Sequence, residues 1–365
     1  MRIDMDHLKL VDHILHREVE AGRLPGAVYA VGMYHDIWRQ NAVGYAETLH
    51  GINRPVHPDT IFDLASLTKV VATLPSVLLL IDEGEIRLED PVSMFLPAFA
   101  HPTSHESAPA ALAKAKAQVT IRHLLTHSSG LPSHRTYYQT CANREEVIQK
   151  VLTEPLEALP GTQVVYSDLG FVLLGEIVEA VSGMRIDEFA AKRIFQPLSM
   201  NETTYRPRAD LRTRIAATEE FEGIVKVGVV HDENTHAMDG VSGHAGLFAP
   251  MDDMVRYVQM WLAEDATVLS PAVRRAAVTC FTMDLNGRRA LGWTCRHDSY
   301  DHTGDLWPAS TVAHTGFTGT SMAFDPASGL WMVLLTNEVH YGRENRTIGR
   351  LRNRLHNLVA AALHK

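Results

Sequence analysis

The spacing of apolar and polar residues divides the chain into stretches of helical and of strand-like periodicity. In the first twenty residues the apolar positions recur every three to four residues, which predicts a helix with Asp6 as its N-cap and Gly22 as its stop. Two β-rich runs follow at 26–33 and 38–45, and the short polar turn between them predicts a hairpin.

The period becomes helical from Ala65 to about Gly183. Between the predicted helices, His101–Ala117 is rich in Pro, Ser, His and Ala, which predicts an exposed loop with a short helical piece. Apolar residues at three- and four-residue spacing predict helices at 66–83, 120–127, 144–153, 168–182 and 186–194.

Strand-like runs return from Ile224 onward. Strands are predicted at 311–313, 320–324 and 331–336, with a turn at 325–329 between the last two. The final stretch, Arg343–His364, is typical of a helix.

Strands at both ends of the chain with helices between them indicate an α+β fold interrupted by a helical insertion. We expect residues 1–64 and 240–365 to form one discontinuous sheet domain and residues 65–239 a mainly helical subdomain. A ligand site would then lie in the cleft between the two parts.

Composition narrows the class of protein without changing this architecture. The 365 residues contain 34 Lys+Arg and 43 Asp+Glu, a net charge of −9, which argues against a nucleic-acid binder that depends on bulk charge. The three cysteines are far apart and odd in number, which fits a reduced compartment better than a disulfide framework. The first twenty residues do not resemble a signal peptide and no apolar run is long enough to span a bilayer, so we expect a cytoplasmic protein without a membrane partner.

The sharpest chemical signal is Ser66-Leu67-Thr68-Lys69 at the start of an apolar helix. Residues three apart share one helical face, so the Lys69 amine can lie beside the Ser66 hydroxyl. A serine needs an adjacent base to become a nucleophile, and a desolvated lysine kept neutral by burial and cationic neighbours can serve. The alternative is an N-capping serine with a solvated lysine.

Two further segments are weak alone but fit the same chemistry. Tyr166-Ser167-Asp168 precedes a predicted helix, where a tyrosine could relay protons; the alternative is a buried tyrosine beside an N-capping Asp168. His314-Thr315-Gly316-Phe317-Thr318-Gly319 lies in a strand-like run, where a glycine marks close approach of another backbone or a ligand; the alternative is a bulge or turn with an incidental histidine.

Together, the three motifs resemble the S-x-x-K, Y-x-N and K/H-T-G set of the serine β-lactamase and penicillin-binding-protein superfamily. The chain is most similar to the branch of class C β-lactamases, D-alanyl-D-alanine carboxypeptidases and related esterases. The stretches at 119–131, 169–183 and 241–248 support this, and the match runs from about residue 20 to 360. The resemblance implies a β-lactamase/transpeptidase-like fold, an antiparallel sheet flanked by helices with an inserted all-helical subdomain.

The resemblance also implies a covalent acyl-enzyme mechanism. Ser66 would attack a carbonyl, with Lys69 and Tyr166 sharing the role of base, and Tyr166 would protonate the leaving group. His314 and Thr315 would polarise the site and bind a substrate carboxylate or carbonyl. Gly316 belongs to the same substrate-binding edge, and the backbone N–H groups of Ser66 and Phe317 would form the oxyanion hole.

Two positions depart from the family pattern. Asp168 stands where family members often carry asparagine, and a carboxylate cannot donate a hydrogen bond to a substrate carbonyl. It could instead pair with Lys69 and hold it charged, or select substrates with an amine near the scissile bond. His314 replaces lysine, and a neutral imidazole attracts a carboxylate less than an ammonium does.

Two other clusters of charged or histidine residues lie outside these motifs. Six His, Asp and Glu residues lie within 231–244, but without a metal-ligand spacing, so a hydrogen-bonded loop is expected rather than a metal. The basic run Arg343, Arg346, Arg350, Arg352 and Arg354 is expected to be the solvated face of a helix.

The sequence therefore predicts a cofactor-independent serine hydrolase that acts by acyl transfer on a small ester, amide or peptide. A carboxylesterase or a D-amino-acid peptidase or amidase is favoured over a β-lactamase or penicillin-binding carboxypeptidase. The rival from another class is a catalytically silent ligand-binding protein, which only Asp168 favours. Metal and nucleic-acid ligands are not expected, and the oligomeric state is left open.

Overall fold

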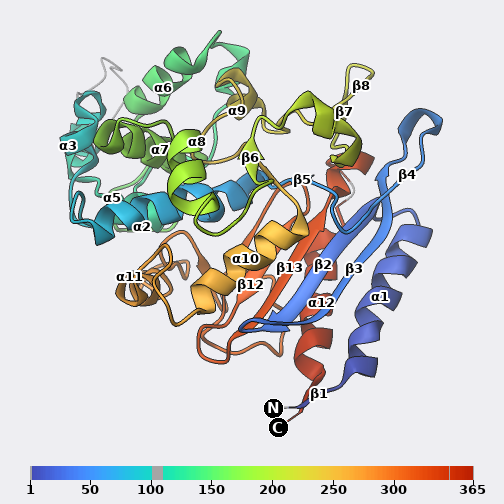
Figure 1. Ribbon diagram of the computed structural model, residues 1–365. Helices are drawn as coiled ribbons and strands as arrows, with labels where there is room; N and C mark the ends of the chain where they lie inside the picture. The colour runs from blue at the N-terminus through green and yellow to red at the C-terminus, as the bar shows by residue number, and fades with distance from the viewer. Residues whose placement is uncertain (1, 101–109, 345, 365) are drawn as a thin grey trace.

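A central antiparallel sheet runs through the half of the protein that contains both termini (Figure 1). The computed structural model describes residues 2–100, 110–344 and 346–364. Within these residues the sheet has seven strands, in the order β10 (Thr294–Cys295), β11 (Val312–Thr315), β12 (Ser321–Phe324), β13 (Leu330–Thr336), β2 (Gly26–Met33), β3 (Asp36–Glu47) and β4 (Arg54–Pro55).

The predicted hairpin and the three predicted C-terminal strands are confirmed. β2 pairs with β3 from Gly26↔Gly44 to Met33↔Asp36. β13 pairs with β2 on one side and β12 on the other, so the last strands of the chain complete the sheet begun by the first. The 325–329 turn between β12 and β13 is closed by the Gly329 N–H, which donates to the carbonyl of Asp325 at 2.9 Å.

Both faces of the central strands are buried, and each face packs into a separate apolar core. In β2, Ala27, Tyr29 and Val31 face one core, whereas Val28 and Ala30 face the other. Helices α1 (Met5–Glu20) and α12 (Ile348–Ala361) cover the first face, and α10 (Met251–Leu262) packs on the second. This alternation is the period of two that a pleated strand imposes.

The first helix starts earlier than the sequence predicted. Its N-cap is Asp4, whose carboxylate accepts hydrogen bonds from the N–H groups of Asp6 and His7 at 3.0 and 2.9 Å. The short strand β1 (Arg2–Ile3) pairs with β14 (Leu363–His364), and the Asp4 N–H donates to the carbonyl of Ala362. The assignment of Asp6 as N-cap was wrong because this pairing of the two chain ends fixes where the helix begins.

The expectation of mainly strand-like structure after Ile224 was also incomplete. Short strands β8 (Ile224–Val225) and β9 (Leu247–Ala249) do occur there, β8 with β7 (Glu220–Phe221) and β9 between β5 (Phe62–Asp63) and β6 (Thr204–Tyr205). The same region also contains helices α9 (Glu233–Ala237), α10 and α11 (Pro271–Ala277). α10 buries Met254, Val258 and Trp261, a three- and four-residue spacing that a strand cannot match.

The predicted helices between Ala65 and Gly183 are confirmed and pack together on one side of the sheet (Figure 1). Of the predicted loop 101–117, residues 101–109 lie outside the described residues, and the rest begins with a short helix. The described α-helices between residues 65 and 190 are α2 (Leu74–Asp82), α3 (Val92–Phe95), α4 (Ala110–Ala115), α5 (Ile121–Leu125), α6 (Arg144–Thr153), α7 (Asp168–Ser182) and α8 (Ile186–Ala190).

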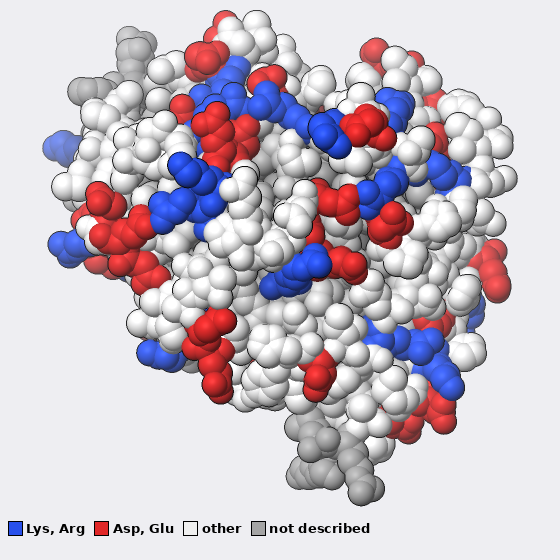
Figure 2. All heavy atoms as spheres, in the orientation of Figure 1, with Lys and Arg blue, Asp and Glu red and all other residues white. Residues whose placement is uncertain are grey.

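Within the described ranges, one helical stretch, Ala65–Asp82, is long and apolar enough to cross a membrane, and 83% of it is buried inside the protein. A helix at the centre of a large core has the same apolar composition, so its burial accounts for the pattern. On the face shown in Figure 2, positive and negative side chains are interspersed. Surface ion pairs include that of Arg214 with Asp59 at 2.9 Å.

Histidines buried in their neutral form predict a loss of stability in mild acid. Burial lowers the pKa of His314 to about 3 and that of His356 to about 4. Between these values and the unfolded pKa near 6.5 the unfolded chain binds more protons, so the free energy of unfolding falls as pH drops below 6.5. At pH 5 each histidine should lower it by about 2 kcal/mol.

Urea denaturation at pH 7.5 and pH 5.0 measures this effect. His356→Phe should lose correspondingly less stability between the two pH values than the parent protein, whereas the exposed-site control His16→Gln should lose as much as the parent. Equal losses in the His356→Phe variant and the parent would contradict the explanation.

Candidate active site

Ser66 lies in a tight turn that directly follows strand β5. The buried Asp63 carboxylate accepts hydrogen bonds from the N–H groups of Ala65 at 2.8 Å and His231 at 2.7 Å. Ala65 has φ = +46°, a left-handed conformation that favours glycine, so the turn is held in a strained shape by these contacts. The strain presents Ser66 as a partly exposed residue between the buried Ala65 and Leu67.

Lys69 is fully buried beside Ser66, as its spacing predicted. Its ammonium donates to the Ser66 hydroxyl at 3.0 Å and to the carbonyl of His244 at 3.0 Å, and its third contact is the Asp168 carboxylate at 2.7 Å. All three ammonium protons therefore have acceptors. The segment Lys69–Thr73 is a π-helical turn, an irregularity that is frequent at functional sites.

Asp168 decides the charge state of this lysine. Burial alone would lower the pKa of Lys69, but the charge of Asp168, with a smaller contribution from Tyr166, raises it above its ordinary value. The pKa of Asp168 is lowered, since the charge of Lys69 and the hydrogen bond of His134 outweigh burial. The geometry thus favours the charged lysine over the neutral one that the motif alone suggested.

Tyr166 completes the group around Ser66. Its ring lies 5.0 Å from the Lys69 ammonium and 4.5 Å from the ring of His127. Burial raises the pKa of Tyr166, Lys69 opposes that rise, and Asp168 adds to it. Tyr166 is therefore a protonated phenol at neutral pH, so the Lys69–Tyr166 pair must lose one proton before it can act as a base.

The helix that follows the second motif is capped by Ser167, not by Asp168. The Ser167 hydroxyl accepts from the Gly170 N–H at 3.4 Å and donates to the carbonyl of Pro132. This leaves the Asp168 side chain in the first turn of α7, where it contacts Lys69 and, at 3.4 Å, the Nδ1 atom of His134. The alternative of an N-capping Asp168 was wrong.

The third motif is joined to the backbone that precedes Ser66. Thr318 donates from its hydroxyl to the carbonyl of Asp63 at 2.7 Å, and Thr320 to that of Leu64 at 3.1 Å. A Cβ on Gly316 would lie 2.4 Å from the Leu64 carbonyl oxygen, so the glycine is required for this close approach. The predicted meaning of this glycine is confirmed.

His314 lies on β11 with its ring 6.1 Å from that of Tyr166. Its Nδ1 atom is 2.9 Å from the carbonyl of Thr315, and its Nε2 atom is buried without a partner in the described part of the chain. Burial, reinforced by the charges of Lys69 and Arg289, keeps His314 neutral. Its neutral imidazole therefore offers no charge to a substrate carboxylate.

Phe317 stands at the exposed end of this turn. The N–H groups of Gly316 and Gly319 are used within the turn, whereas that of Phe317 has no acceptor in the residues that the structure describes. Its carbonyl accepts from Arg346, and its ring packs 4.4 Å from the Arg346 guanidinium. The free N–H is where a developing oxyanion could be bound, as the resemblance implied.

Four residues near the site were not identified from the sequence as functional candidates. His127, in the stretch 119–131 that supported the resemblance, accepts from the Ser167 N–H through Nδ1 at 3.0 Å, and burial lowers its pKa well below the usual value. No motif in the sequence marks His134 as functional, because only the folding of the chain brings it close to Asp168. The remaining two are Arg352 and Tyr300.

The basic run near the C-terminus is only in part a solvated helix face: Arg350 is exposed on α12, whereas Arg343 and Arg346 precede that helix. Arg352 is buried and donates to the carbonyls of Gly316 at 3.2 Å and Thr320 at 2.7 Å, and Arg343 pairs with Glu219 and Glu233. The prediction was wrong for Arg352 because a helical period shows which residues share a face but not which carbonyls lie opposite.

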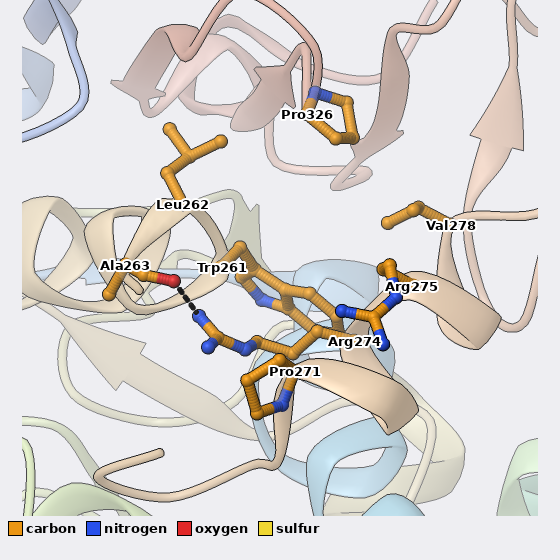
Figure 3. Close-up of a pocket in the computed structure, with 8 residues that line it drawn as sticks. All are labelled: Trp261, Leu262, Ala263, Pro271, Arg274, Arg275, Val278 and Pro326. Atoms are coloured by element: carbon orange, nitrogen blue, oxygen red, sulfur yellow. Dashed lines mark hydrogen bonds between the residues drawn. The ribbon is translucent and has the colours of Figure 1, made fainter. Parts of the chain in front are cut away.

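The acidic and histidine-rich loop contacts this group through its backbone, since the His244 carbonyl accepts from Lys69 and the His231 N–H donates to Asp63. The cavity in Figure 3 shares no lining residue with the group. His244 bonds Asp232 at 2.9 Å and Ser242 at 2.8 Å, and among the described residues no three metal-ligating side chains converge. The cavity in Figure 3, about 180 Å³, lies between α10, α11 and the β12–β13 turn. Arg274, one of the residues that line this cavity, donates to the carbonyl of Ala263 at 2.6 Å.

A serine beside a buried lysine and a tyrosine, with an unused backbone N–H in the turn of the third motif, is the arrangement of a serine hydrolase that works through an acyl-enzyme. The Beta-lactamase family model matches residues 11–356, and the chain belongs to that family. It is a β-lactamase-like serine hydrolase of small esters or amides.

Individual relatives span different chemistries. The chain is 33% identical to the N-acetylmuramyl-L-alanine amidase of Bacillus subtilis (strain 168), over 91% of this chain and 81% of that protein. It is 30% identical to a putative D-alanyl-D-alanine carboxypeptidase of Salmonella schwarzengrund (strain CVM19633), over 92% and 84%. The fold matches EstCE1, a hydrolase with promiscuous acyltransferase activity, with a TM-score of 0.78 at 21% identity, covering 98% and 99% of the two chains.

Replacing Asp168 with asparagine should raise the acylation rate at neutral pH. Asp168 raises the pKa of both Lys69 and Tyr166, so its removal makes the pair easier to deprotonate. In both proteins the acylation rate should rise with pH as the pair loses its proton, and in the variant this rise should occur at lower pH. Stopped-flow measurement of acylation by p-nitrophenyl acetate between pH 6 and 10 gives this pH dependence. An unchanged or lower rate at pH 7 in the variant would show that the carboxylate is not inhibitory.

Proposed function

We propose that this protein is an amidase that cleaves the bond between an N-acetylmuramyl group and L-alanine. The observation that carries the proposal is the pair of protonated groups, Lys69 and Tyr166, beside Ser66. An amine leaves an amide only after it receives a proton, and this pair holds protons at neutral pH. The amidase relative, at 33% identity, supports the choice of acyl and leaving groups.

In the proposed reaction the Ser66 oxygen forms a bond to the acyl carbon, and the carbon–nitrogen bond breaks. The Ser66 proton passes to the Lys69–Tyr166 pair, after that pair has lost one proton, and Tyr166 delivers it to the departing amine. Water then attacks the ester, its proton passes to the same pair, and the Ser66 hydroxyl is restored. The N–H groups of Ser66 and Phe317 hold the oxyanion in both steps, while His314, Thr315 and Gly316 shape the edge along which the substrate lies.

The test uses muramyl dipeptide, N-acetylmuramyl-L-alanyl-D-isoglutamine, with product detection by mass spectrometry. Release of L-alanyl-D-isoglutamine that is absent with Ser66→Ala is the expected result. An N-acylated D-alanyl-D-alanine peptide, p-nitrophenyl acetate and nitrocefin are compared in parallel. Release of D-alanine with muramyl dipeptide left intact would favour a carboxypeptidase, and turnover of the ester alone would favour an esterase.

We also propose a cytoplasmic location. The support is the set of three free cysteines, Cys141, Cys280 and Cys295, which suits a reducing compartment. Fractionation of the native host should recover the activity with cytoplasmic markers; recovery with an exported fraction would overturn this proposal.

A further inference from the structure

A cavity of about 320 Å³ lies directly beside Tyr166. One wall comes from the loops that precede α7 and the other from the loops on either side of β10, so the cavity joins the helical region to the sheet. Its lining residues are Ser133, Val164, Val165, Tyr166, Asn286, Gly287, Arg289, Asp298, Ser299 and Tyr300.

Tyr300 forms the outer wall and is 60% exposed, yet its ring is held in place. The ring centroid lies 6.1 Å from that of Tyr166, and the Arg289 guanidinium lies 5.0 Å from the Tyr300 ring. The carboxylate of the buried Asp298 accepts from the Tyr300 N–H at 2.8 Å and from Arg289 at 3.1 Å. An exposed aromatic ring fixed on a buried ion pair is a preorganised binding surface.

The position of Tyr166 shows which part of a substrate this cavity would receive. The carbonyl oxygen of the substrate must point toward the free N–H of Phe317, whereas the departing amine must reach the proton of Tyr166. Tyr166 is both that proton donor and a wall of the cavity. The cavity therefore begins where the leaving group lies.

We propose that this cavity is a leaving-group subsite and that Tyr300 is its specificity-determining residue. The occupant is the peptide part of the substrate: a planar amide stacks on the Tyr300 ring, and Ser133 and Ser299 provide polar contacts around it. The Asn286 amide holds the wall in place, since it accepts from the Val164 N–H at 2.6 Å and donates to the Val164 carbonyl at 3.2 Å. Arg289 and Asp298 neutralise one another, so the subsite would recognise the peptide by stacking on its planar amide rather than by charge. The identity of the peptide rests on the proposed amidase function, whereas the assignment of the cavity to the leaving group does not.

The test separates acylation from deacylation, because the leaving group is absent from the acyl-enzyme. Tyr300→Ala should lower kcat/KM for muramyl dipeptide by about 10-fold, and Tyr300→Phe should retain it. Hydrolysis of the acetyl-enzyme formed from p-nitrophenyl acetate should be unchanged in both variants. The exposed Tyr45→Ala on β3 is the matched control for loss of a surface tyrosine. Equal slowing of acylation and deacylation would indicate a structural role and overturn the proposal.

A second measurement keeps the subsite testable if the proposed function fails. If the native enzyme leaves muramyl dipeptide intact, L-alanyl-D-isoglutamine is offered as an acceptor to the acetyl-enzyme, since an attacking amine enters through the leaving-group subsite. Transfer to the dipeptide should compete with water in the native enzyme and fall about 10-fold in Tyr300→Ala. Equal transfer by both proteins, or no transfer by the native enzyme, would overturn the assignment of this cavity.

Discussion

Replacing Ser66 with alanine should lower turnover of every substrate by at least about 10⁴-fold while leaving the fold intact. The Ser66 hydroxyl accepts a hydrogen bond from the buried ammonium of Lys69 at 3.0 Å. It lies in the turn whose preceding carbonyls, those of Asp63 and Leu64, are held by the hydroxyls of Thr318 and Thr320. Alanine keeps those backbone contacts because none of them uses the serine side chain. Only the covalent step should be lost.

Steady-state kinetics and intact-protein mass spectrometry measure this loss. The native enzyme should gain the mass of an acyl group when mixed with p-nitrophenyl acetate, and Ser66→Ala should not. The thermal midpoint of the variant should match that of the parent within a few degrees, which separates chemistry from folding. Activity that survives in Ser66→Ala would identify another nucleophile, and an inactive native enzyme would favour the silent binding protein.

The chemistry of the site was predictable from the sequence because it depends on short segments. Ser66 and Lys69 are one helical turn apart, so local geometry alone brings them together. Gly316 was informative because only glycine permits the approach to Leu64. The fold class was predictable from the order of the elements, since strands at both ends of the chain with helices between them indicate one sheet interrupted by a helical insertion.

Contacts between distant segments could not be predicted in the same way. The pairing of Asp168 with Lys69 was one of two open alternatives, because a motif does not show where a carboxylate points. The helix α10 was missed, as strand-like runs on both sides masked its period. The basic run was misjudged for a related reason: exposure of a helix face depends on what packs against it, and Arg352 packs against the turn that carries Phe317.

Arg352 provides the second large expected effect. Its guanidinium is buried and donates to the carbonyls of Gly316 and Thr320, the two residues that bracket the turn around Phe317. Burial lowers the pKa of Arg352 to about 9, with Glu338 opposing, so the charge is retained at neutral pH. We expect Arg352→Met to lower kcat by about 10²-fold with little change in KM, because a misplaced Phe317 N–H weakens the bond to the oxyanion and not to the ground state.

The kinetic steps that slow in the variant distinguish this effect from a general loss of stability. The oxyanion forms in both acylation and deacylation, so Arg352→Met should slow both steps alike, whereas Tyr300→Ala should slow acylation alone. Arg352→Lys should recover part of kcat, since an ammonium can still donate to one of the carbonyls. The exposed Arg350→Met, from the same helix, is the control for loss of a charge from α12. A folded Arg352→Met protein with normal kcat would show that the turn holds its shape without this arginine, and the oxyanion site would then depend on the threonine contacts to Asp63 and Leu64 alone.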